Sequence, residues 1–250
     1  MQYGICQLSI VPIRSIPDEA SELVSQLLFG EHFKILKSRK NWSRIKTIFD
    51  KCEGWIMNSQ LKFISDNEFN AIQESKHFNY VADLISFVKD SNEIETPIVI
   101  GSCIYNTPPL SVNFNGNLLT NVQPKENLSN TSLLYLNSPE LKGGKSPFGI
   151  DSAGFTQMVY RVNGYHLLRT AEQQSTQGTA LSFVEESEAG DLAFFDNVNG
   201  VIDHVGIIMD NNYVIHVNGK VRIDRIDHTG IFNKDLRTYT HQLRVIKKVI

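Results

Sequence analysis

Three short stretches in the second half of the sequence contain residue types that together could perform nucleophilic or acid–base chemistry. They are residues 149–155, 203–206 and 215–217. A nucleophile at a helix start, a base on a strand and a polar group that orients the base form the general logic of a catalytic triad. We therefore assign Ser152 to the nucleophile position, His204 to the base position and His216 to the orienting position.

The elements that must position these side chains follow from hydrophobic periodicity. Apolar residues recur at i, i+3, i+4 and i+7 over 155–162, which predicts a helix that begins near Ser152 and stops at Asn163 and Gly164. Strands are predicted over 191–195, 204–209, 213–217 and 221–226. A hairpin between the second and third strands would bring His216 beside His204. One helix layer packed on an antiparallel sheet is the expected arrangement.

The first half of the sequence has a different pattern. Short β-branched and aromatic runs within residues 1–64 predict a small β barrel. Helical spacing is expected over 66–90, and a second β segment over 97–122, with a hairpin turn at Asn115 and Gly116. The predicted fold class is α+β, and the predicted domains are residues 1–64, 65–126 and 127–250.

Composition and charge exclude several classes of function. The 250 residues carry 24 basic and 27 acidic side chains, which gives a net charge of −3. This composition lacks the excess of basic charge that is typical of proteins that bind nucleic acid or an anionic membrane surface. We expect no cofactor and no metal, because His204, His216 and Asp203 lack the spacing of helical zinc ligands. The oligomeric state is left open.

The N-terminus and the cysteines bear on location. The first residues lack a basic region followed by an apolar stretch, and no apolar run approaches the ~20 residues of a membrane helix. The three cysteines are widely separated, which is typical of reduced thiols. These observations favour a cytoplasmic protein, or a periplasmic or exported one if a signal segment has been removed.

Several motifs give the chain a specific resemblance. It resembles the NlpC/p60 family of papain-like cysteine peptidases that cut bacterial cell-wall peptides, in particular the subgroup with two N-terminal SH3-like modules. The matching stretches in the second half are residues 145–151, 154–157, 167–169, 173–174, 190–195, 204–207 and 215–216. In the first half, residues 26–31 and 54–56 are similar to the first SH3-like module. The resemblance implies two SH3-like barrels followed by a papain-like domain.

The chain departs from the family's pattern at the positions where chemistry would occur. The family motif Asp-Cys-Ser-Gly is Asp151, Ser152, Ala153 and Gly154 here, so the nucleophilic thiol is missing. Glu140 and Lys142 replace a tyrosine and a tryptophan that precede this site in the family. Cys52 replaces a tyrosine of the SH3-like module that helps to hold the substrate's free amine. The resemblance places Asp151, Ala153, Glu140, Lys142, Cys52 and Asp203 in the substrate-binding site.

Three interpretations of Ser152 remain open. It could cap the helix or be otherwise inert, it could be a working nucleophile, or it could be a serine that replaces a native cysteine. The resemblance and the departures together favour a degenerate peptidase that binds an L-Ala-γ-D-Glu-diamino acid peptide, or a protein partner, without efficient cleavage. The alternatives are an active γ-D-glutamyl-L-diamino acid endopeptidase and a purely structural interaction module.

Overall fold

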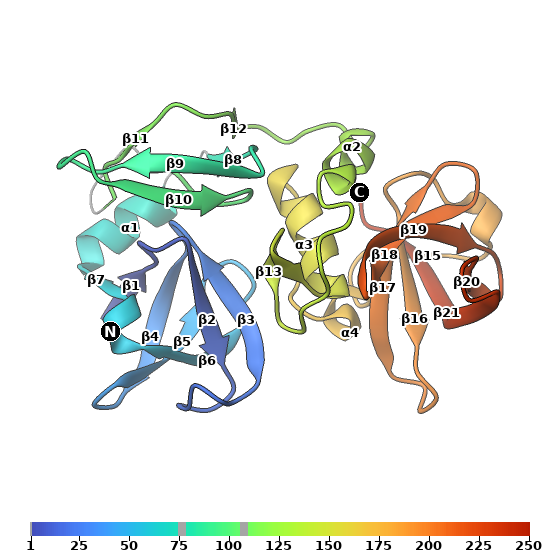
Figure 1. Ribbon diagram of the computed structural model, residues 1–250, viewed down its shortest axis with the longest axis horizontal. Coiled ribbons are helices and arrows are strands. Elements are labelled where there is room, and N and C mark those ends of the chain that lie inside the picture. The colour runs from blue at the N-terminus through green and yellow to red at the C-terminus, as the bar shows by residue number, and fades with distance from the viewer. Residues whose placement is uncertain (1, 75–78, 106–109) are drawn as a thin grey trace. The chain divides into compact units, whose positions relative to one another are not determined.

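The computed structural model describes residues 2–74, 79–105 and 110–250, which fall into two compact units (Figure 1). The first unit comprises residues 1–122 and 142–147, and the second comprises residues 123–141 and 148–250. The chain therefore passes from one unit to the other three times. None of the described helices is long and apolar enough to cross a membrane.

The first unit is built on a strongly hydrogen-bonded antiparallel sheet with the strand order β3-β2-β6-β5-β4-β1-β7. Its strands are β1 (Gln2–Ile5), β2 (Ile10–Arg14), β3 (Leu23–Leu28), β4 (His32–Ser38), β5 (Trp42–Thr47), β6 (Glu53–Met57) and β7 (Lys62–Ile64), with a short 3-10 helix η1 (Asn58–Gln60) before β7. Alternate apolar side chains of these strands form one core that includes Val11, Leu27, Phe33, Ile45 and Ile56. This agrees with the small β module predicted from the short strand-like runs.

The rest of the first unit differs from the helical prediction. A helix, α1 (Asp66–Glu74), is present, but β8 (Tyr80–Val81) and β9 (Ile85–Lys89) occupy the later part of the predicted helical segment. Pairing with β10 (Glu95–Val99) on one side and β11 (Asn113–Phe114) on the other holds β9 extended. Residues 75–78, including the apolar Phe78 used for the helical spacing, lie outside the described residues.

The hairpin predicted at Asn115 and Gly116 is also wrong. The strands that flank this turn are β11 and β12 (Leu118–Leu119), and they pair with different partners. β11 pairs with β9, whereas β12 pairs with β8. Two-residue turn signals favour a hairpin locally, but here the pairing with more distant strands determines the topology.

A segment that lies late in the sequence completes the first unit. Residues 142–147 contain β13 (Lys145–Ser146), and the side chain of Lys145 is 1% exposed. Its ammonium lies 3.0 Å from the carboxylate of Glu31, which is 5% exposed, and its backbone N–H donates to Gln26 at 2.7 Å. A buried ammonium requires such partners because an unpaired charge is expensive to desolvate.

The second unit packs helix α3 (Ser152–Val162) against a closed sheet. The strand order is β15-β21-β16-β17-β18-β19-β20, and β20 also pairs with β21, so six strands close into a barrel (Figure 1). The strands are β14 (Gly149–Ile150), β15 (Thr179–Leu181), β16 (Leu192–Asp196), β17 (Ile202–Met209), β18 (Tyr213–Asn218), β19 (Lys220–Ile226), β20 (Gly230–Asn233) and β21 (Thr238–Lys248). The remaining elements are α2 (Asn127–Leu133), α4 (Ala171–Gln174) and the 3-10 helix η2 (Val184–Glu186).

The predictions for the second unit agree closely with these elements. The predicted helix at Ser152 and the four predicted strands are present within two residues at each end. Helix α4 begins with a capping box, in which the Thr170 side chain accepts from the Gln173 backbone N–H. Every residue of α3 is buried, and the helix contacts β17 and β18, so its first turn faces the strands that carry the two predicted histidines.

Candidate functional site

Three neighbouring strands of the second unit carry a chain of hydrogen bonds between buried polar side chains. His204 Nε2 on β17 lies 2.9 Å from His216 Nδ1 on β18. His216 Nε2 lies 3.1 Å from Asp224 Oδ2 on β19. Since a carboxylate can only accept, His216 donates from Nε2, accepts at Nδ1 and therefore receives the proton of His204 Nε2. The structure thus brings His204 and His216 together, as a β17–β18 hairpin requires.

The close approach of β17 and β18 depends on a glycine. Gly206 pairs directly with His216, and a Cβ built at Gly206 would lie 2.6 Å from Val214 Cγ2 and 3.0 Å from His216 Cβ. A side chain at this position would therefore push the two strands apart. The glycine in the His204-Val205-Gly206 sequence keeps the two imidazoles within hydrogen-bonding distance.

Arg222 holds Asp224, the last side chain of this hydrogen-bonded series, in place. Its guanidinium donates to both oxygens of Asp224, at 2.6 Å and 2.9 Å, and also pairs with the exposed Asp235 at 2.9 Å. Burial of Asp224 opposes ionisation, but the bonds from His216 and Arg222 lower the pKa of its carboxyl below the usual value. Asp224 is therefore ionised at neutral pH and holds His216 in one tautomer.

The two histidines are neutral at neutral pH. Burial lowers the pKa of His204 well below its ordinary value, and the neighbouring His241 and His216 lower it further. Burial also lowers the pKa of His216, although the hydrogen bond to Asp224 partly opposes this effect. A neutral His204 is in the protonation state that a general base requires.

Asp151, rather than Ser152, caps the start of α3. Asp151 Oδ1 accepts from the Gly154 backbone N–H at 2.6 Å, and Arg169 donates to Asp151 Oδ1 and Oδ2 at 2.9 Å and 2.7 Å. Ser152 is instead the first helical residue. The interpretation of Ser152 as a helix cap is therefore wrong, because the preceding carboxylate takes that position and also favours the positive end of the helix dipole.

Ser152 is buried, with 9% of its surface exposed. Among the residues that the structure describes, neither His204 nor His216 forms a hydrogen bond with its hydroxyl. The proposed nucleophile and base therefore lie in one unit without being linked. Ala153 next to it is buried, and its carbonyl accepts from Gln174 Nε2 at 2.9 Å.

The other predicted substrate-binding residues are divided between the two units. Glu140 accepts from the backbone N–H of Gly219, next to the end of β18, and its charge acts on His216. Asp203 accepts from Asn197 at 3.0 Å, and its charge acts on His241. Cys52 and Lys142 belong to the first unit, where Lys142 pairs with Glu22 at 2.5 Å. Their predicted roles in substrate binding stay predictions.

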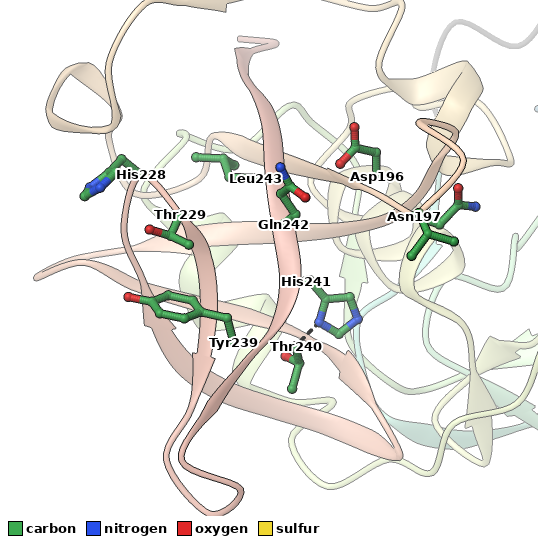
Figure 2. A pocket seen from close by; sticks show the side chains of 10 residues that line it. Asp196, Asn197, His228, Thr229, Tyr239, Thr240, His241, Gln242 and Leu243 are labelled. Carbon is green, nitrogen blue, oxygen red and sulfur yellow. Dashed lines mark hydrogen bonds between the residues drawn. The ribbon is translucent and has the colours of Figure 1, made fainter.

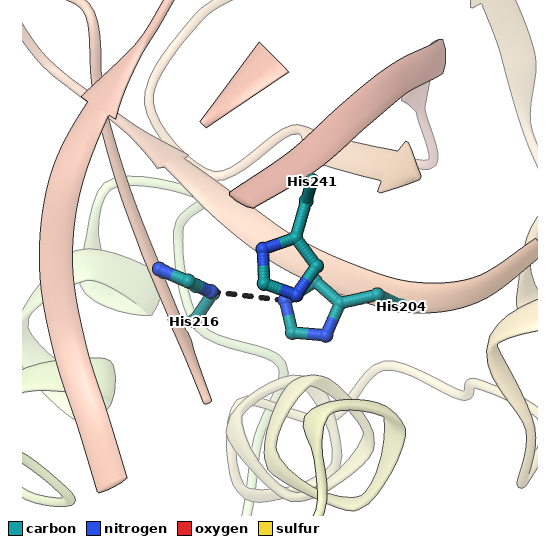
Figure 3. Close-up of side chains that lie close together, drawn as sticks. All are labelled: His204, His216 and His241. Carbon is teal, nitrogen blue, oxygen red and sulfur yellow. Dashed lines mark hydrogen bonds between the residues drawn. The ribbon is translucent and has the colours of Figure 1, made fainter. Parts of the chain in front are cut away.

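Sequence reasoning missed two residues of this site, Asp224 and His241. Asp224 lies two residues after Arg222 on β19, so the two side chains point to the same face of the strand. This alternation was only a weak signal that Asp224 faces the histidines. The ring of His241 stacks on that of His204, with centroids 3.9 Å apart and an interplanar angle of 25° (Figure 3). Nothing local indicates this contact, because β21 reaches β17 only through the intervening strand β16.

The comparisons with known proteins agree with this geometry. Residues 141–240 match the NlpC/P60 family, and residues 13–61 match the bacterial dipeptidyl-peptidase Sh3 domain. The chain carries an NlpC/P60 domain. Proteins named as dipeptidyl-peptidases are among those to which it is similar. The predicted α+β fold with an N-terminal SH3-like region and an NlpC/P60 domain is confirmed. The second SH3-like module stays a prediction.

Individual relatives match to different extents. Dipeptidyl-peptidase 6 of Lysinibacillus sphaericus is 26% identical over 254 residues, which cover 89% of this chain and 91% of that protein. A gamma-D-glutamyl-L-lysine dipeptidyl-peptidase of Bacillus subtilis (strain 168) is 34% identical over 93 residues, which cover 36% of this chain but only 31% of that protein. The crystal structure of an NlpC/P60 family protein from Bacillus cereus ATCC 10987 has a TM-score of 0.80 at 17% identity, with 99% of both chains covered.

Proposed function

We propose that this NlpC/P60 domain binds a cell-wall peptide of the L-Ala-γ-D-Glu-diamino acid type without cleaving it efficiently. The observation that carries the proposal is Ser152, a hydroxyl at the position where the family motif has the nucleophilic cysteine. The base and its supporting hydrogen bonds are present, but the group that would attack is one that ionises poorly.

The chemistry of the two nucleophiles explains the expected loss of activity. A cysteine at a helix start beside a histidine is readily converted to a thiolate, whereas a serine must lose its proton during attack. Ser152 makes no hydrogen bond to His204 within the described part of the chain, so no donor–acceptor pair is ready for that transfer. A loss of about 4 kcal/mol of transition-state stabilisation would reduce the rate about a thousandfold.

Peptide binding is supported separately. The resemblance assigns Asp151 to the α-amine of the peptide. Glu140 adds negative charge near His216, and Asp203 adds negative charge near His241. The dipeptidyl-peptidase of Bacillus subtilis is named for a gamma-D-glutamyl bond. A cationic amine at the free end of such a peptide would therefore meet acidic groups. A protein partner with a free N-terminal amine is the alternative ligand.

The test measures binding and hydrolysis on the same protein. Isothermal titration with L-Ala-γ-D-Glu-diamino acid peptide should give saturable binding, and mass spectrometry at high protein concentration should show little product. Ser152→Ala is the matched variant and should bind equally well. Substantial turnover that disappears in Ser152→Ala would overturn the proposal, and absence of heat with the peptide would overturn its binding part.

One observation favours a second function, an active serine-dependent hydrolase. The hydrogen-bonded series from His204 through His216 to Asp224 is complete and could support a base. A backbone N–H at the start of α3 could contribute to an oxyanion hole. The same assay distinguishes the two functions, because only the hydrolase would lose activity in Ser152→Ala.

A Ser152→Cys variant tests whether the nucleophile is the only defect. We expect that it will not restore family-like hydrolysis, because Glu140, Lys142 and Cys52 still replace aromatic residues that position the substrate. The measurement is kcat/KM for the same peptide. Strong rescue by this single substitution would show that the other departures have little effect.

A further inference from the structure

His204, His216 and His241 bring three imidazoles together in the second unit (Figure 3). One ring nitrogen of each lies within 4.8 Å of the others. Two nitrogens bound to one Zn²⁺ at about 2.0–2.1 Å can be at most about 4.2 Å apart. The rings of His204 and His241, which stack in this structure, must therefore turn relative to each other to place all three nitrogens on one ion. We propose that these three histidines bind one transition-metal ion of the Zn²⁺ class.

The hydrogen bonds around the rings would orient them as ligands. His216 donates from Nε2 to Asp224 at 3.1 Å, which directs its Nδ1 lone pair toward His204. A carboxylate that accepts from the second nitrogen of a metal-binding histidine is a recurrent arrangement. His241 Nδ1 lies 2.9 Å from Thr240 Oγ1, which leaves Nε2 of His241 as its ligand atom.

Binding requires one tautomer change and no loss of protons. The proton that His204 Nε2 donates to His216 would move to Nδ1 of the His204 ring. The two nitrogens that face each other, His204 Nε2 and His216 Nδ1, would then both offer a lone pair. Each ring then keeps one N–H and offers its other nitrogen, which is the form in which histidine binds a metal ion.

The charges around the cluster favour a cation. The negative charges of Asp224 and Glu140 interact electrostatically with His216, and those of Asp203 and Asp224 interact with His241. Arg222 opposes them, but its guanidinium is paired with both Asp224 and Asp235. The net electrostatic environment of the three rings is therefore acidic.

An entry path is also present. His241 lies in the wall of a pocket of about 830 Å³ whose other residues include Asp196, Asn197, Tyr239 and Gln242 (Figure 2). His241 is thus shared between the open pocket and the buried pair of histidines. Three protein ligands beside an open pocket leave a coordination position for water, as in catalytic rather than structural zinc sites.

The experiment uses the full, untagged chain after treatment with a chelator. Titration calorimetry with ZnCl₂ should show one ion per chain, and Co²⁺ should give the intense visible absorption of a tetrahedral site. His241→Asn should weaken Zn²⁺ affinity more than about 100-fold, and Asp224→Asn by about 10–100-fold. His228→Asn, which changes another histidine of the same pocket, is the matched control and should alter affinity less than twofold.

A measurement on the unmodified protein keeps the test independent of folding defects in the variants. Nitrogen-15 NMR of the histidine rings should show Zn²⁺-dependent shifts for His204, His216 and His241 and a change of tautomer at His204. Shifts confined to other histidines, Zn²⁺ affinity unchanged in His241→Asn, or no binding at micromolar Zn²⁺ would each overturn the proposal. None of these readouts depends on peptide binding or hydrolysis.

Discussion

The strands β17 to β19 and the start of α3 lie in one unit, but they differ in how many of their polar side chains are joined to one another by hydrogen bonds. On the strands, His204, His216 and Asp224 form a continuous series that Arg222 completes. At the helix start, Asp151 caps α3 and pairs with Arg169, whereas Ser152 has no hydrogen bond to the histidines among the described residues. The strand side is stabilised by its own hydrogen bonds and does not require a nucleophile. Retained histidines alone are therefore weak evidence for turnover.

The largest expected effect would come from the helix side. Asp151→Ala should lower the free energy of unfolding by about 3–5 kcal/mol, because it removes both the buried ion pair with Arg169 and the cap of α3. Urea denaturation measures this change. Asp151→Asn retains a capping oxygen and should lose less. Equal losses in the two variants would show that the ion pair contributes little.

The next effect concerns acid sensitivity on the strand side. The pKa of His241 is lowered to about 4, so the folded protein binds fewer protons than the unfolded chain at pH values below its ordinary value of 6.5. The free energy of unfolding should therefore decrease as the pH falls from 6.5 to 4, by about 1–3 kcal/mol. Denaturation of metal-free protein across this range measures the slope, and His241→Gln should reduce it. His204 and His216, whose pKa values are also lowered, contribute to the remaining slope, and only a slope that is unchanged in this variant would place the titration away from His241.

The smallest effect is expected at Ser152. Ser152→Ala should change the free energy of unfolding by less than about 0.5 kcal/mol, because Asp151 and not Ser152 caps the helix. Thermal unfolding of the two proteins makes this comparison. A loss near the ~1 kcal/mol typical of a removed cap would show that the serine hydroxyl has a structural partner after all.

The features that could be predicted from the sequence are the local ones. The start of α3 and the β17–β18 hairpin follow from apolar spacing and a turn within a few residues, so His204 and His216 could be placed together. His241 could not, because its approach depends on the register of β21 against β16 and β20. Residues 80–89 were misassigned because the short apolar run over 81–88 suits either a helix or a strand, and pairing of β9 with β10 decides the outcome.

The buried pair between Lys145 and Glu31 has a consequence for how the protein can be divided. The peptide that supplies Lys145 leaves the second unit at residue 141 and returns to it at residue 148. A single proteolytic cut near residue 122 would therefore divide the first unit itself, because residues 142–147 stay attached to the second unit. A fragment that ends at residue 122 would also lack the ammonium that neutralises Glu31. The fragment would lose this buried ion pair, so it should be less stable than the same residues within the whole chain.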